Sequence, residues 1–231
     1  MKTSICIPCY EMGGKGHEYL NMLLDIVSLQ RGVMFDVVVS DQSTDDKVRQ
    51  TCDEYEFVKY HKFDGPRNPC DNLNNAIELS DGEVIKILFQ DDFFFPDPDS
   101  LFRCVSPILE GRARWTACTT LHTKDGTLLE NPIVPVFHEK IHYGKNTMSS
   151  PSIISVLKEG IPRFDPNLSL YLDVDWYKRV HGIHGDFHLV KEPCVVNRLH
   201  PRSLSSHIDK NYQEVVDRET KYVSEKYGDS R

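Results

Sequence analysis

The sequence predicts an α/β fold in which a mostly parallel sheet is flanked by helices. Through residues 4–89, short apolar runs typical of buried strands alternate with apolar residues at helical spacing, as in parallel strands joined by helical crossovers. Polar residues follow three of these strands, at the sheet edge where such folds bind ligands. The 231 residues suffice for one domain with a substantial core.

The first half of the chain contains the clearest elements. We expect, in order, a strand at 4–8, a helix around 19–27, a strand at 34–41, a helix starting at 43–46, a strand at 57–60, a helix at about 71–79 and a strand at 84–89. The run MFDVVVSD is rich in β-branched residues and ends in an acid, which is typical of a buried strand. The next residues, STDD, offer oxygen atoms that can cap the free N–H groups of a helix.

Beyond Pro96 the hydrophobic pattern is less regular. We expect, in order, a helix at about 99–109, β segments at 115–122 and 128–137, a turn at 149–152, a helix at 172–185, a strand at 186–199 and a polar helix at about 208–227. In the helix LDVDWYKRVHGIHG, Val174, Tyr177 and Val180 recur at helical spacing. The sequence contains no internal repeat and no linker-like tract.

Composition and charge exclude several classes of protein. The formal charge is −8 and the pI is near 5.7, whereas a nucleic-acid-binding domain presents a basic face. No run approaches the roughly 18 apolar residues that span a bilayer, and the start MKTSICIPCY has no signal-peptide core. Seven cysteines, an odd number spread along the chain, suit free thiols. We therefore expect a soluble cytoplasmic protein with no transmembrane segment and no nucleic-acid partner.

Cys6 and Cys9 have the CxxC spacing of redox and zinc sites. A redox pair needs its first sulfur at a helix N-terminus, where the dipole lowers the thiol pKa. Cys6 instead lies inside an expected strand, and no second CxxC supplies the rest of a zinc site. We interpret both residues as ordinary thiols.

His138, Glu139 and His142 match the HExxH signature of zinc peptidases. That signature requires both histidines on one face of a helix, with the glutamate activating water. Two prolines precede the match and its surroundings are β-like, which leaves little room for a helix. We interpret the match as a surface loop, with a zinc peptidase as a distant alternative.

Asp91 and Asp92 stand between the apolar run VIKILF and three phenylalanines. Unpaired carboxylates in an apolar setting are costly, so this pair needs a compensating partner. Two acids at the end of a rigid strand can hold a hard divalent cation that bridges phosphates. The other interpretation is a solvated turn, but the apolar walls and the acid Asp41 at a second strand end favour a metal site.

Two further polar groups lie late in the sequence. Asp173 and Asp175 begin a helix, where acids favour the helix dipole, and equally one of them could be a general base for a substrate hydroxyl. After the last strand, NRLHPRS brings Arg198, His200 and Arg202 close together. An imidazole there could bind a metal, and a guanidinium could neutralise a phosphate.

The order of these motifs resembles that of the GT-A fold glycosyltransferases of family 2. The resemblance covers about residues 3–206 and rests on the stretches SICIPCYE, VVVSDQSTDD, NLNNAIELSDGEVIKILFQDD, SSPSIISVLKEGIPRFDPNLSLYLDVDWYKR and NRLHPRSLS. It implies a Rossmann-like, mostly parallel sheet flanked by helices, with a smaller β segment on the acceptor side. A nucleotide-sugar donor would bind at the strand ends.

The resemblance also implies roles for individual residues. In the nucleotide site, the implied residues are Pro8, Tyr10, Glu11 and Asp41 for the base, and Asn74 and Asp91 for the ribose and diphosphate. Asp92 would bind Mn²⁺ or Mg²⁺, and His200 would complete the metal or diphosphate site. Asp173 would be the general base that deprotonates the acceptor. Apart from the resemblance, Asp175, Trp176, Arg198 and Arg202 are candidates for acceptor or phosphate contacts.

Three positions depart from the family pattern. Phe89 stands where the first acid of the DxD motif is usual, Glu11 replaces an asparagine after the tyrosine, and Leu73 replaces a frequent arginine. The QxxRW signature of processive synthases is absent from the sequence. We therefore expect transfer of one sugar per encounter, with the metal site depending chiefly on Asp92.

These observations together predict a metal-dependent, inverting glycosyltransferase. It would move one hexosyl or deoxyhexosyl group from a nucleotide-diphosphate sugar, UDP-linked, to a hydroxyl of a saccharide or other acceptor. A single domain would cover 1–231, with a nucleotide-sugar half at about 1–98, an acceptor half at about 99–206 and a C-terminal helix at 207–231. The alternatives are a nucleotide-binding module without turnover and an acidic receiver domain, which lacks its expected acid pair here because only Glu11 follows the first strand.

Overall fold

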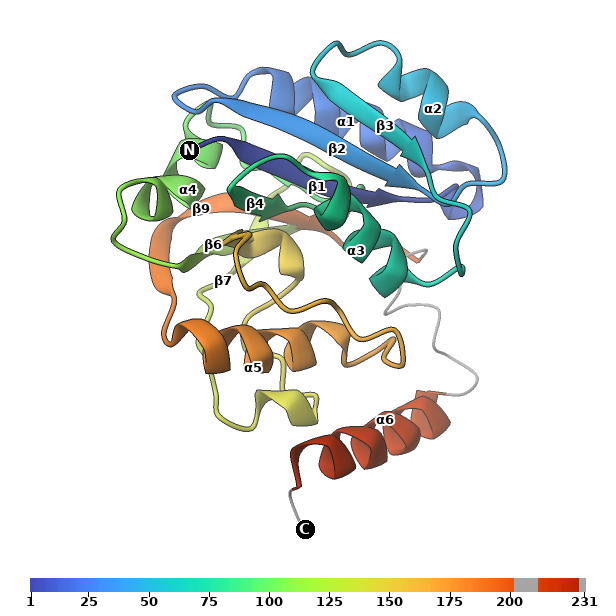
Figure 1. Ribbon diagram of the computed structural model, residues 1–231. Coiled ribbons are helices and arrows are strands. Elements are labelled where there is room, and N and C mark those ends of the chain that lie inside the picture. Colours follow the sequence, from blue (N-terminus) through green and yellow to red (C-terminus); the bar gives the residue numbers. More distant parts are fainter. Residues whose placement is uncertain (202–211, 229–231) are drawn as a thin grey trace.

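The computed structural model describes residues 1–201 and 212–228. Its centre is one sheet with the strand order β3-β2-β1-β4-β8-β6-β9-β5, and β7 pairs with β6 (Figure 1). The strands are β1 (Thr3–Cys9), β2 (Phe35–Asp41), β3 (Val58–Lys62), β4 (Val84–Ile87), β5 (Phe93–Phe94), β6 (Trp115–Thr123), β7 (Glu130–Ile133), β8 (Ile154–Leu157) and β9 (His188–Arg198).

The strands β3, β2, β1 and β4 run parallel, as the sequence predicts. The register places Ile5 of β1 between Val37 of β2 and Lys86 of β4. The centre of β2, including Val38 and Val39, is fully buried, as is usual where helices cover both faces of a parallel sheet. The predicted helix-flanked parallel sheet is confirmed for this half.

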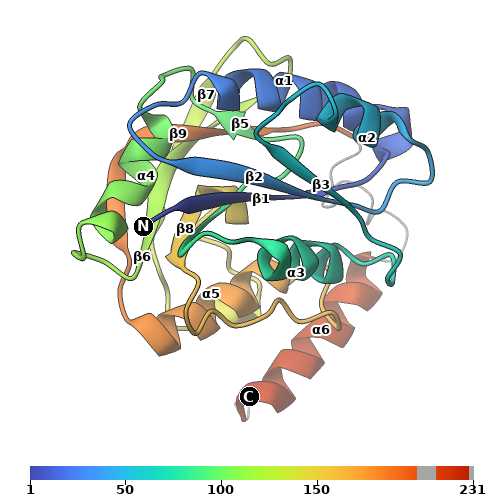
Figure 2. The same ribbon diagram turned by 45° about the horizontal axis from the view of Figure 1, so that its top comes forward.

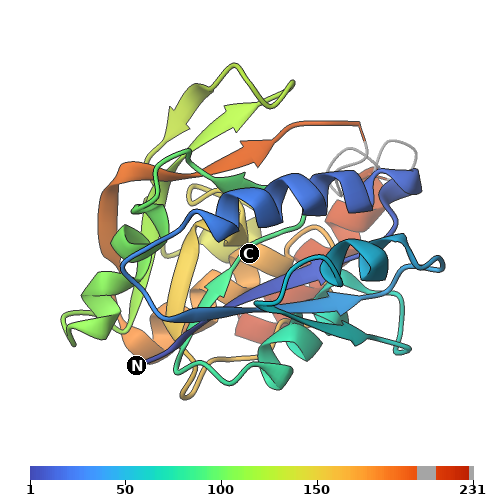
Figure 3. The ribbon, with the colours of Figure 1, turned by 90° about the horizontal axis from the view of Figure 1, so that it is seen from above.

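The other half of the sheet is mixed. β8 lies antiparallel to β4 and β6, β6 and β9 are parallel, and β5 and β7 pair antiparallel with β9 and β6. The sequence analysis missed β8, which has four residues, and β5, which has two, because segments this short carry little periodicity. The β6–β7 hairpin extends beyond the rest of the sheet (Figure 3).

Helices cover both faces of the sheet, and each helix expected from the sequence is present. The helices are α1 (Gly16–Ser28), α2 (Lys47–Cys52), α3 (Pro69–Leu79), α4 (Ser100–Leu109), α5 (Leu172–His184) and α6 (Tyr212–Tyr227), with 3₁₀ turns η1 (Met12–Gly14), η2 (Ile141–Tyr143) and η3 (Pro151–Ile153). Figure 2 shows α1 and α2 on one side of the sheet and α3, α5 and α6 on the other. This places the starts of α3 and α5 on the same side.

Local sequence explains where α3 begins. The side chain of Asn68 accepts hydrogen bonds from the N–H groups of Cys70 at 2.7 Å and Asp71 at 3.4 Å, and Pro69 occupies the first turn. This is a side-chain N-cap followed by a residue that needs no donor there. At α2 the N-cap is Asp46, but its side chain makes no capping bond. The capping predicted at 43–46 is therefore wrong for Asp46.

Buried acids attach α6 to the rest of the protein. Glu219 is fully buried, and its carboxylate accepts hydrogen bonds from the N–H groups of residues 169–171 at 2.9–3.0 Å. Asp175 of α5 is also fully buried. It accepts a hydrogen bond from the Tyr227 hydroxyl at 2.8 Å and forms an ion pair with Lys226 at 2.8 Å. The helix therefore holds the segment that leads into α5.

Among the described residues, none of the helices combines the length and apolar character needed to cross a bilayer. The seven cysteines are all buried and carry free thiols. In β1, burial raises the pKa of Cys6 to about 12, which makes it an inert thiol and not a redox centre.

Candidate active site

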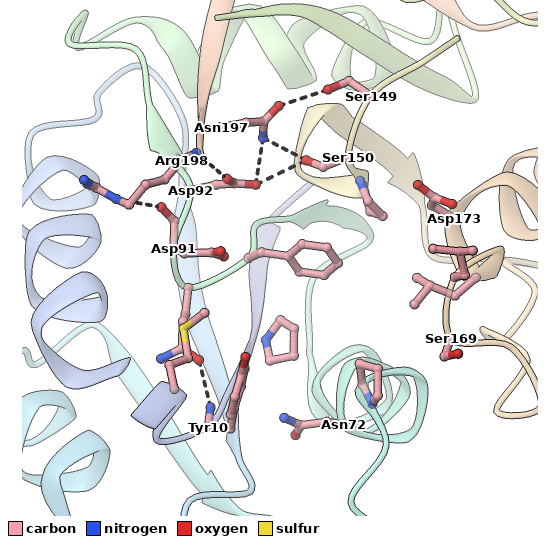
Figure 4. Close-up of a pocket in the computed structure, with 18 of the residues that line it drawn as sticks. Tyr10, Asn72, Asp91, Asp92, Ser149, Ser150, Ser169, Asp173, Asn197 and Arg198 are labelled. Carbon is pink, nitrogen blue, oxygen red and sulfur yellow. Dashed lines mark hydrogen bonds between the residues drawn. The ribbon is translucent and has the colours of Figure 1, made fainter. Parts of the chain in front are cut away.

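A cavity of about 700 Å³ lies at the carboxyl ends of β1 and β4. Its walls come from segments far apart in the sequence, namely residues 8–12, 67–72, 89–92, 146–151, 169–173 and 197–199. Figure 4 shows Asp91 and Asp92 on one wall and Asp173 on another, with Tyr10 and Asn72 below them. The acids expected at strand ends and at the start of α5 thus face one space.

The ends of β1 and β4 are joined by one side chain. The Gln90 carbonyl oxygen accepts a hydrogen bond from the Tyr10 N–H at 2.8 Å. Gly16 lies against the same turn, and a Cβ on it would be 2.1 Å from the Tyr10 carbonyl oxygen, so a larger residue would displace the turn. Pro8 and Tyr10 consequently line the cavity, while their contact with a base stays a prediction.

Glu11 does not line the cavity but forms an ion pair with Arg67, which does, with 2.5 Å between the charged atoms. Burial raises the pKa of Glu11, and the Arg67 guanidinium more than offsets this, so that the pKa lies below its ordinary value. Glu11 therefore orients the Arg67 guanidinium at the cavity wall and does not itself face the cavity.

Two residues expected in the nucleotide site are placed elsewhere. Asp41 is fully buried and is not among the lining residues; its carboxylate accepts hydrogen bonds from Ser43 N–H at 2.8 Å and from Tyr60 hydroxyl at 2.9 Å. Asn74 forms a pair of hydrogen bonds with the backbone of Phe164 at 2.7 and 2.8 Å. Both side chains are used inside the protein, so neither reaches the cavity.

Residues near Asp41 and Asn74 in the sequence line the cavity in their place. Gln42, directly after β2, and Asn72, on the face of α3 turned toward β1, both line it. Asn72 donates to the Cys9 carbonyl at 2.9 Å, while its buried side-chain oxygen has no hydrogen-bond partner among the described residues. An unsatisfied buried carbonyl oxygen is unusual. This oxygen could accept a hydrogen bond from an N–H or O–H group of a ligand in the cavity.

Asp92 is buried within a set of hydrogen-bond donors. One carboxylate oxygen accepts from the Arg198 N–H at 3.1 Å, and the other accepts from Asn197 Nδ2 at 2.7 Å and Ser150 Oγ at 3.2 Å. Asn197 also donates to Ser150, at 2.8 Å (Figure 4). The side chain is thus oriented by β9 and by the segment before η3.

These donors do not fully compensate the charge of Asp92. Burial, and then the neighbouring Asp91 carboxylate, raise the pKa of Asp92 to about 7. Asp91 in turn contacts the imidazole of His200, with 2.9 Å between Oδ2 and Nε2. Two adjacent carboxylates, one of them buried, favour a further positive charge nearby.

Arg198 contributes its backbone to the site more than its charge. Its guanidinium donates to the Asp91 carbonyl at 3.3 Å and lies over the rings of Tyr19 and Phe93, 5.0 and 5.3 Å from their centroids. Such stacking fixes the end of β9. The predicted contact of Arg198 with phosphate stays a prediction.

The segment 146–150 carries a strained residue next to the acids. Ser149 has φ of 84°, which is left-handed and uncommon outside glycine. Its hydroxyl donates to Asn197 at 3.0 Å, and its carbonyl accepts from the Tyr177 hydroxyl at 3.0 Å. Backbone strain held by surrounding bonds in this way is frequent at functional sites.

Asp173 lies in the first turn of α5, on the wall opposite Asp92 (Figure 4). Its carboxylate accepts hydrogen bonds from Val174 N–H at 2.7 Å and from Asn146 Nδ2 at 2.6 Å. Burial raises the pKa of Asp173 to about 7 although these bonds act in the opposite direction. A carboxylate with this pKa can accept a proton near neutral pH.

The remaining predicted acceptor residues are structural or lie elsewhere. Asp175 is bound by Arg179 at 2.6 Å and by α6, away from the cavity. Trp176 is fully buried; it stacks on Phe164 with 4.6 Å between ring centroids and donates to the Pro162 carbonyl at 2.7 Å. Neither lines the cavity. Arg202 lies outside the described residues.

The HExxH match does not form a metal site. Only His142 is in the short turn η2, and Glu139 forms an ion pair with Lys178 at 2.9 Å. His138 accepts a hydrogen bond from the Lys140 N–H at 3.0 Å. The helix that the signature requires is therefore missing, in agreement with its interpretation as a loop.

Sequence reasoning missed the residues that orient the acids. Gln90, Asn146, Ser150 and Asn197 all contact an acid or a strand end of the site. Single polar residues of this kind have no periodicity and no motif. Gln90 and Asn197 directly precede Asp91 and Arg198, and this position at a strand end was the one signal in the sequence for these two residues.

Comparison with known proteins supports the same class. The sequence profile of glycosyl transferase family 2 matches residues 4–159. S. aureus TarS 1-349 in complex with UDP-GlcNAc aligns with a TM-score of 0.68 and 19% identity, over 89% of this chain and 61% of that one. The complex of TarS 1-349 with UDP aligns with a TM-score of 0.67 and 17% identity, over 100% of this chain and 73% of that one. The mannosyltransferase PcManGT from Pyrobaculum calidifontis was solved in complex with GDP-Man and Mn²⁺. It aligns with a TM-score of 0.59 and 16% identity, over 95% of this chain and 68% of that one.

The curled sheet and the acid-lined cavity at its strand ends define a glycosyltransferase of the GT-A type. Because the family profile covers more than half of the sequence, the chain belongs to glycosyl transferase family 2. At these identities the likeness to the solved structures concerns the fold. The chain spans 61% of the length of the UDP-GlcNAc-bound TarS chain, and curated protein sequences give no match.

The donor set fits a hard divalent cation. Asp91 and Asp92 offer carboxylate oxygens, and burial with the neighbouring Asp91 raises the pKa of Asp92, a shift that a bound cation would oppose. Among the described residues, Asp91, Asp92 and His200 do not form a group of three converging ligands. This agrees with a cation held by one or two carboxylates and by the phosphates of a substrate.

Proposed function

We propose that this protein is a metal-dependent, inverting glycosyltransferase that moves one hexosyl or deoxyhexosyl group per encounter from a nucleotide-diphosphate sugar to an acceptor hydroxyl. The observation that carries the proposal is that Asp91 and Asp92 face the same cavity as Asp173 but from another wall (Figure 4). The two functions of such an enzyme, binding a diphosphate and activating an acceptor, thus have separate acids on separate elements.

Asp173 is the proposed general base. It is ionised above a pKa of about 7, and it lines the cavity. The first-turn position and the Asn146 amide hold the carboxylate in place. In a single displacement it removes the proton of the acceptor hydroxyl while that oxygen attacks the anomeric carbon, which inverts the configuration.

Asp91 and Asp92 are the proposed holders of Mn²⁺ or Mg²⁺. When bound, the cation supplies positive charge to the diphosphate leaving group. The protein contributes the orientation of Asp92, through Asn197, Ser150 and the Arg198 N–H. His200 contacts Asp91 and not the cavity, so it acts by orienting that carboxylate.

The donor is proposed to be UDP-linked. TarS was solved in complex with UDP-GlcNAc and with UDP, and PcManGT in complex with GDP-Man. In this chain the nucleoside end is proposed to lie against Pro8 and Tyr10, with Gln42 and Asn72 as hydrogen-bonding groups at the same end of the cavity.

Thermal shift tests metal and nucleotide together. At a concentration about 100 times Kd, a ligand adds about 2.7 kcal/mol to the stability, which for a domain of this size raises Tm by roughly 5–10 °C. UDP should produce this shift in the presence of Mn²⁺ or Mg²⁺ and not with EDTA. The Asp92→Ala variant should lose the metal-dependent part, and GDP serves as the comparison. No shift with any nucleoside diphosphate and metal would contradict the proposal.

Turnover separates the enzyme from a nucleotide-binding module of the same fold. Asp173→Asn should retain the UDP shift and lose transfer by about 100-fold to 10,000-fold, because the base and the donor site lie on different elements. Trp176, which does not reach the cavity, gives a matched control in Trp176→Phe. A wild-type protein that binds donor but transfers to no hydroxyl acceptor and does not hydrolyse it would instead be a binding module.

A further inference from the structure

Three cysteines outside the active site form a compact buried cluster. Cys104 of α4, Cys118 of β6 and Cys194 of β9 are each fully buried, and their sulfur atoms all lie within 4.8 Å of one another. They are far apart in the sequence, and the packing of α4 on β6 and β9 brings them together. Among the described residues this is the only group of three or more potential metal ligands that converges in this way.

A buried lysine lies near the same cluster. Lys86 of β4 is fully buried, and its ammonium group donates to the carbonyls of Ser152 and Ile154 and lies 5.9 Å from the ring centroid of Phe94. In the described part of the chain it forms no ion pair with a carboxylate. A buried ammonium without an anion is costly.

A thiolate in the cysteine cluster would supply the missing anion. Hydrogen bonds from Cys118 and Cys194, with the nearby positive charge of Lys86, lower the pKa of Cys104 well below its ordinary value, although burial opposes this. The pKa of Cys118 and that of Cys194 are raised, the first chiefly by burial and the second chiefly by its hydrogen bonds with the other two thiols. The two neighbouring sulfurs and Lys86 thus favour the thiolate form of Cys104, which is the form that binds a metal.

We propose that Cys104, Cys118 and Cys194 form a binding site for a soft monovalent metal ion, Cu(I), with Lys86 as its counter-charge. Thiolates select soft ions of this kind. Metal–sulfur bonds of about 2.3 Å place three sulfurs in a plane roughly 4 Å apart, which the observed separations permit. This site is separate from the proposed transferase function and uses none of its residues.

The number of ligands argues against zinc. Structural zinc sites have four protein ligands, and catalytic ones keep a fourth position for water. The described residues provide no fourth ligand at this cluster, and full burial of all three cysteines leaves no water-filled position. A three-coordinate ion matches what the cluster offers.

Binding of Cu(I) also preserves the charge balance. The ion and Lys86 each carry one positive charge, so the metal-bound site is neutral when two of the three cysteines bind as thiolates and their protons have passed to solvent. No oxidation or reduction is involved, because the ion enters and stays as Cu(I).

Competition under anaerobic, reducing conditions tests the proposal. The folded protein is titrated with Cu(I) buffered by bathocuproine disulfonate, and binding is followed by loss of the chelate colour and by the near-ultraviolet thiolate–copper absorption. We expect one ion per chain and release of protons on binding. Cys118→Ser should weaken binding by more than 10-fold and Lys86→Met by about 10-fold to 100-fold, as for residues that support metal ligands.

Cys9→Ala is the matched control, since Cys9 is equally buried but belongs to the CxxC of β1. It should leave the affinity unchanged. Circular dichroism and cooperative thermal unfolding establish that each variant is folded, and Cys194→Ala replaces Cys118→Ser if the latter is not. Equal affinities for wild type and folded cluster variants, or loss of binding on Cys9→Ala alone, would overturn the proposal.

Discussion

The hydrogen bond between Asn146 and Asp173 allows the proposed base to be shifted without removing it. Asn146 Nδ2 donates to Asp173 at 2.6 Å, while Asn146 Oδ1 accepts from the N–H groups of Met148 at 2.9 Å and Ser149 at 3.0 Å. In Asn146→Asp the acceptor oxygens remain, so the turn at 146–149 keeps its backbone bonds. The donor to Asp173 is lost and a second negative charge takes its place.

The size of the effect follows from that bond. A hydrogen bond to a charged group contributes about 1.5–3 kcal/mol, and the low end applies because Asn146 is exposed. One pKa unit corresponds to about 1.4 kcal/mol. Loss of the bond therefore raises the pKa of Asp173 from about 7 by roughly one unit, and the added charge acts in the same direction.

The consequence is a shift of the pH profile. Transfer requires ionised Asp173, so the rate rises with pH through its pKa and reaches a plateau above it. In Asn146→Asp this rising limb should move to higher pH by about one unit. The rate should be about fivefold lower than wild type at neutral pH and should recover at the alkaline plateau.

The assay is the release of nucleoside diphosphate at saturating donor and acceptor, measured as kcat from about pH 5.5 to 9.5. Asn131→Asp makes the same charge change at an exposed residue of β7 that does not contact Asp173. This control variant should leave the rising limb of the pH–rate profile unchanged. If Asn146→Asp lowers kcat equally at every pH without moving the limb, Asp173 is not the titrating base.

Three further predictions concern stability and the metal. Asn197→Ala removes a donor from buried Asp92, so it should destabilise the protein by about 2–4 kcal/mol and weaken Mn²⁺ binding, as measured by denaturant unfolding and thermal shift. Glu219→Gln weakens the attachment of residues 169–171 and should cost about 1–3 kcal/mol and reduce acceptor affinity, seen as a higher KM. The folded-state pKa of Asp92, about 7, lies above its unfolded value, so its contribution to stability is complete in acid and lost as pH rises through 7. Metal-free wild type should therefore lose more Tm between about pH 5 and 8 than Asp92→Asn does, and added Mn²⁺ should reverse that loss.

Much of the fold could be predicted because its first half is periodic. Residues 3–87 form parallel strands and crossover helices, and their apolar residues recur at regular spacing or in short runs, such as the valines of β2. The mixed half was harder, since β8 and β5 are too short to show a period. These strands form because β4, β6 and β9 offer backbone hydrogen bonds from distant parts of the chain.

The candidate site divides in the same way. Asp91, Asp92 and Asp173 were found because acids at strand ends and helix starts stand out beside apolar runs. Asp41 and Asn74, which looked equivalent in sequence, turn inward to Tyr60 and Phe164. Whether a polar side chain faces a ligand or a backbone amide depends on partners that lie far away in the chain.

The class of fold, the family resemblance and the acids at the strand ends follow from the sequence alone, since they depend on local pattern and on the order of motifs. Which acids meet in one cavity, and which donors orient them, follows from the packing of the folded chain. This packing alone assembled Asn197 beside Asp92, Asn146 beside Asp173 and the three sulfurs of the cysteine cluster. The physical reason is that hydrogen bonding and charge act over a few ångströms in space, irrespective of separation along the chain.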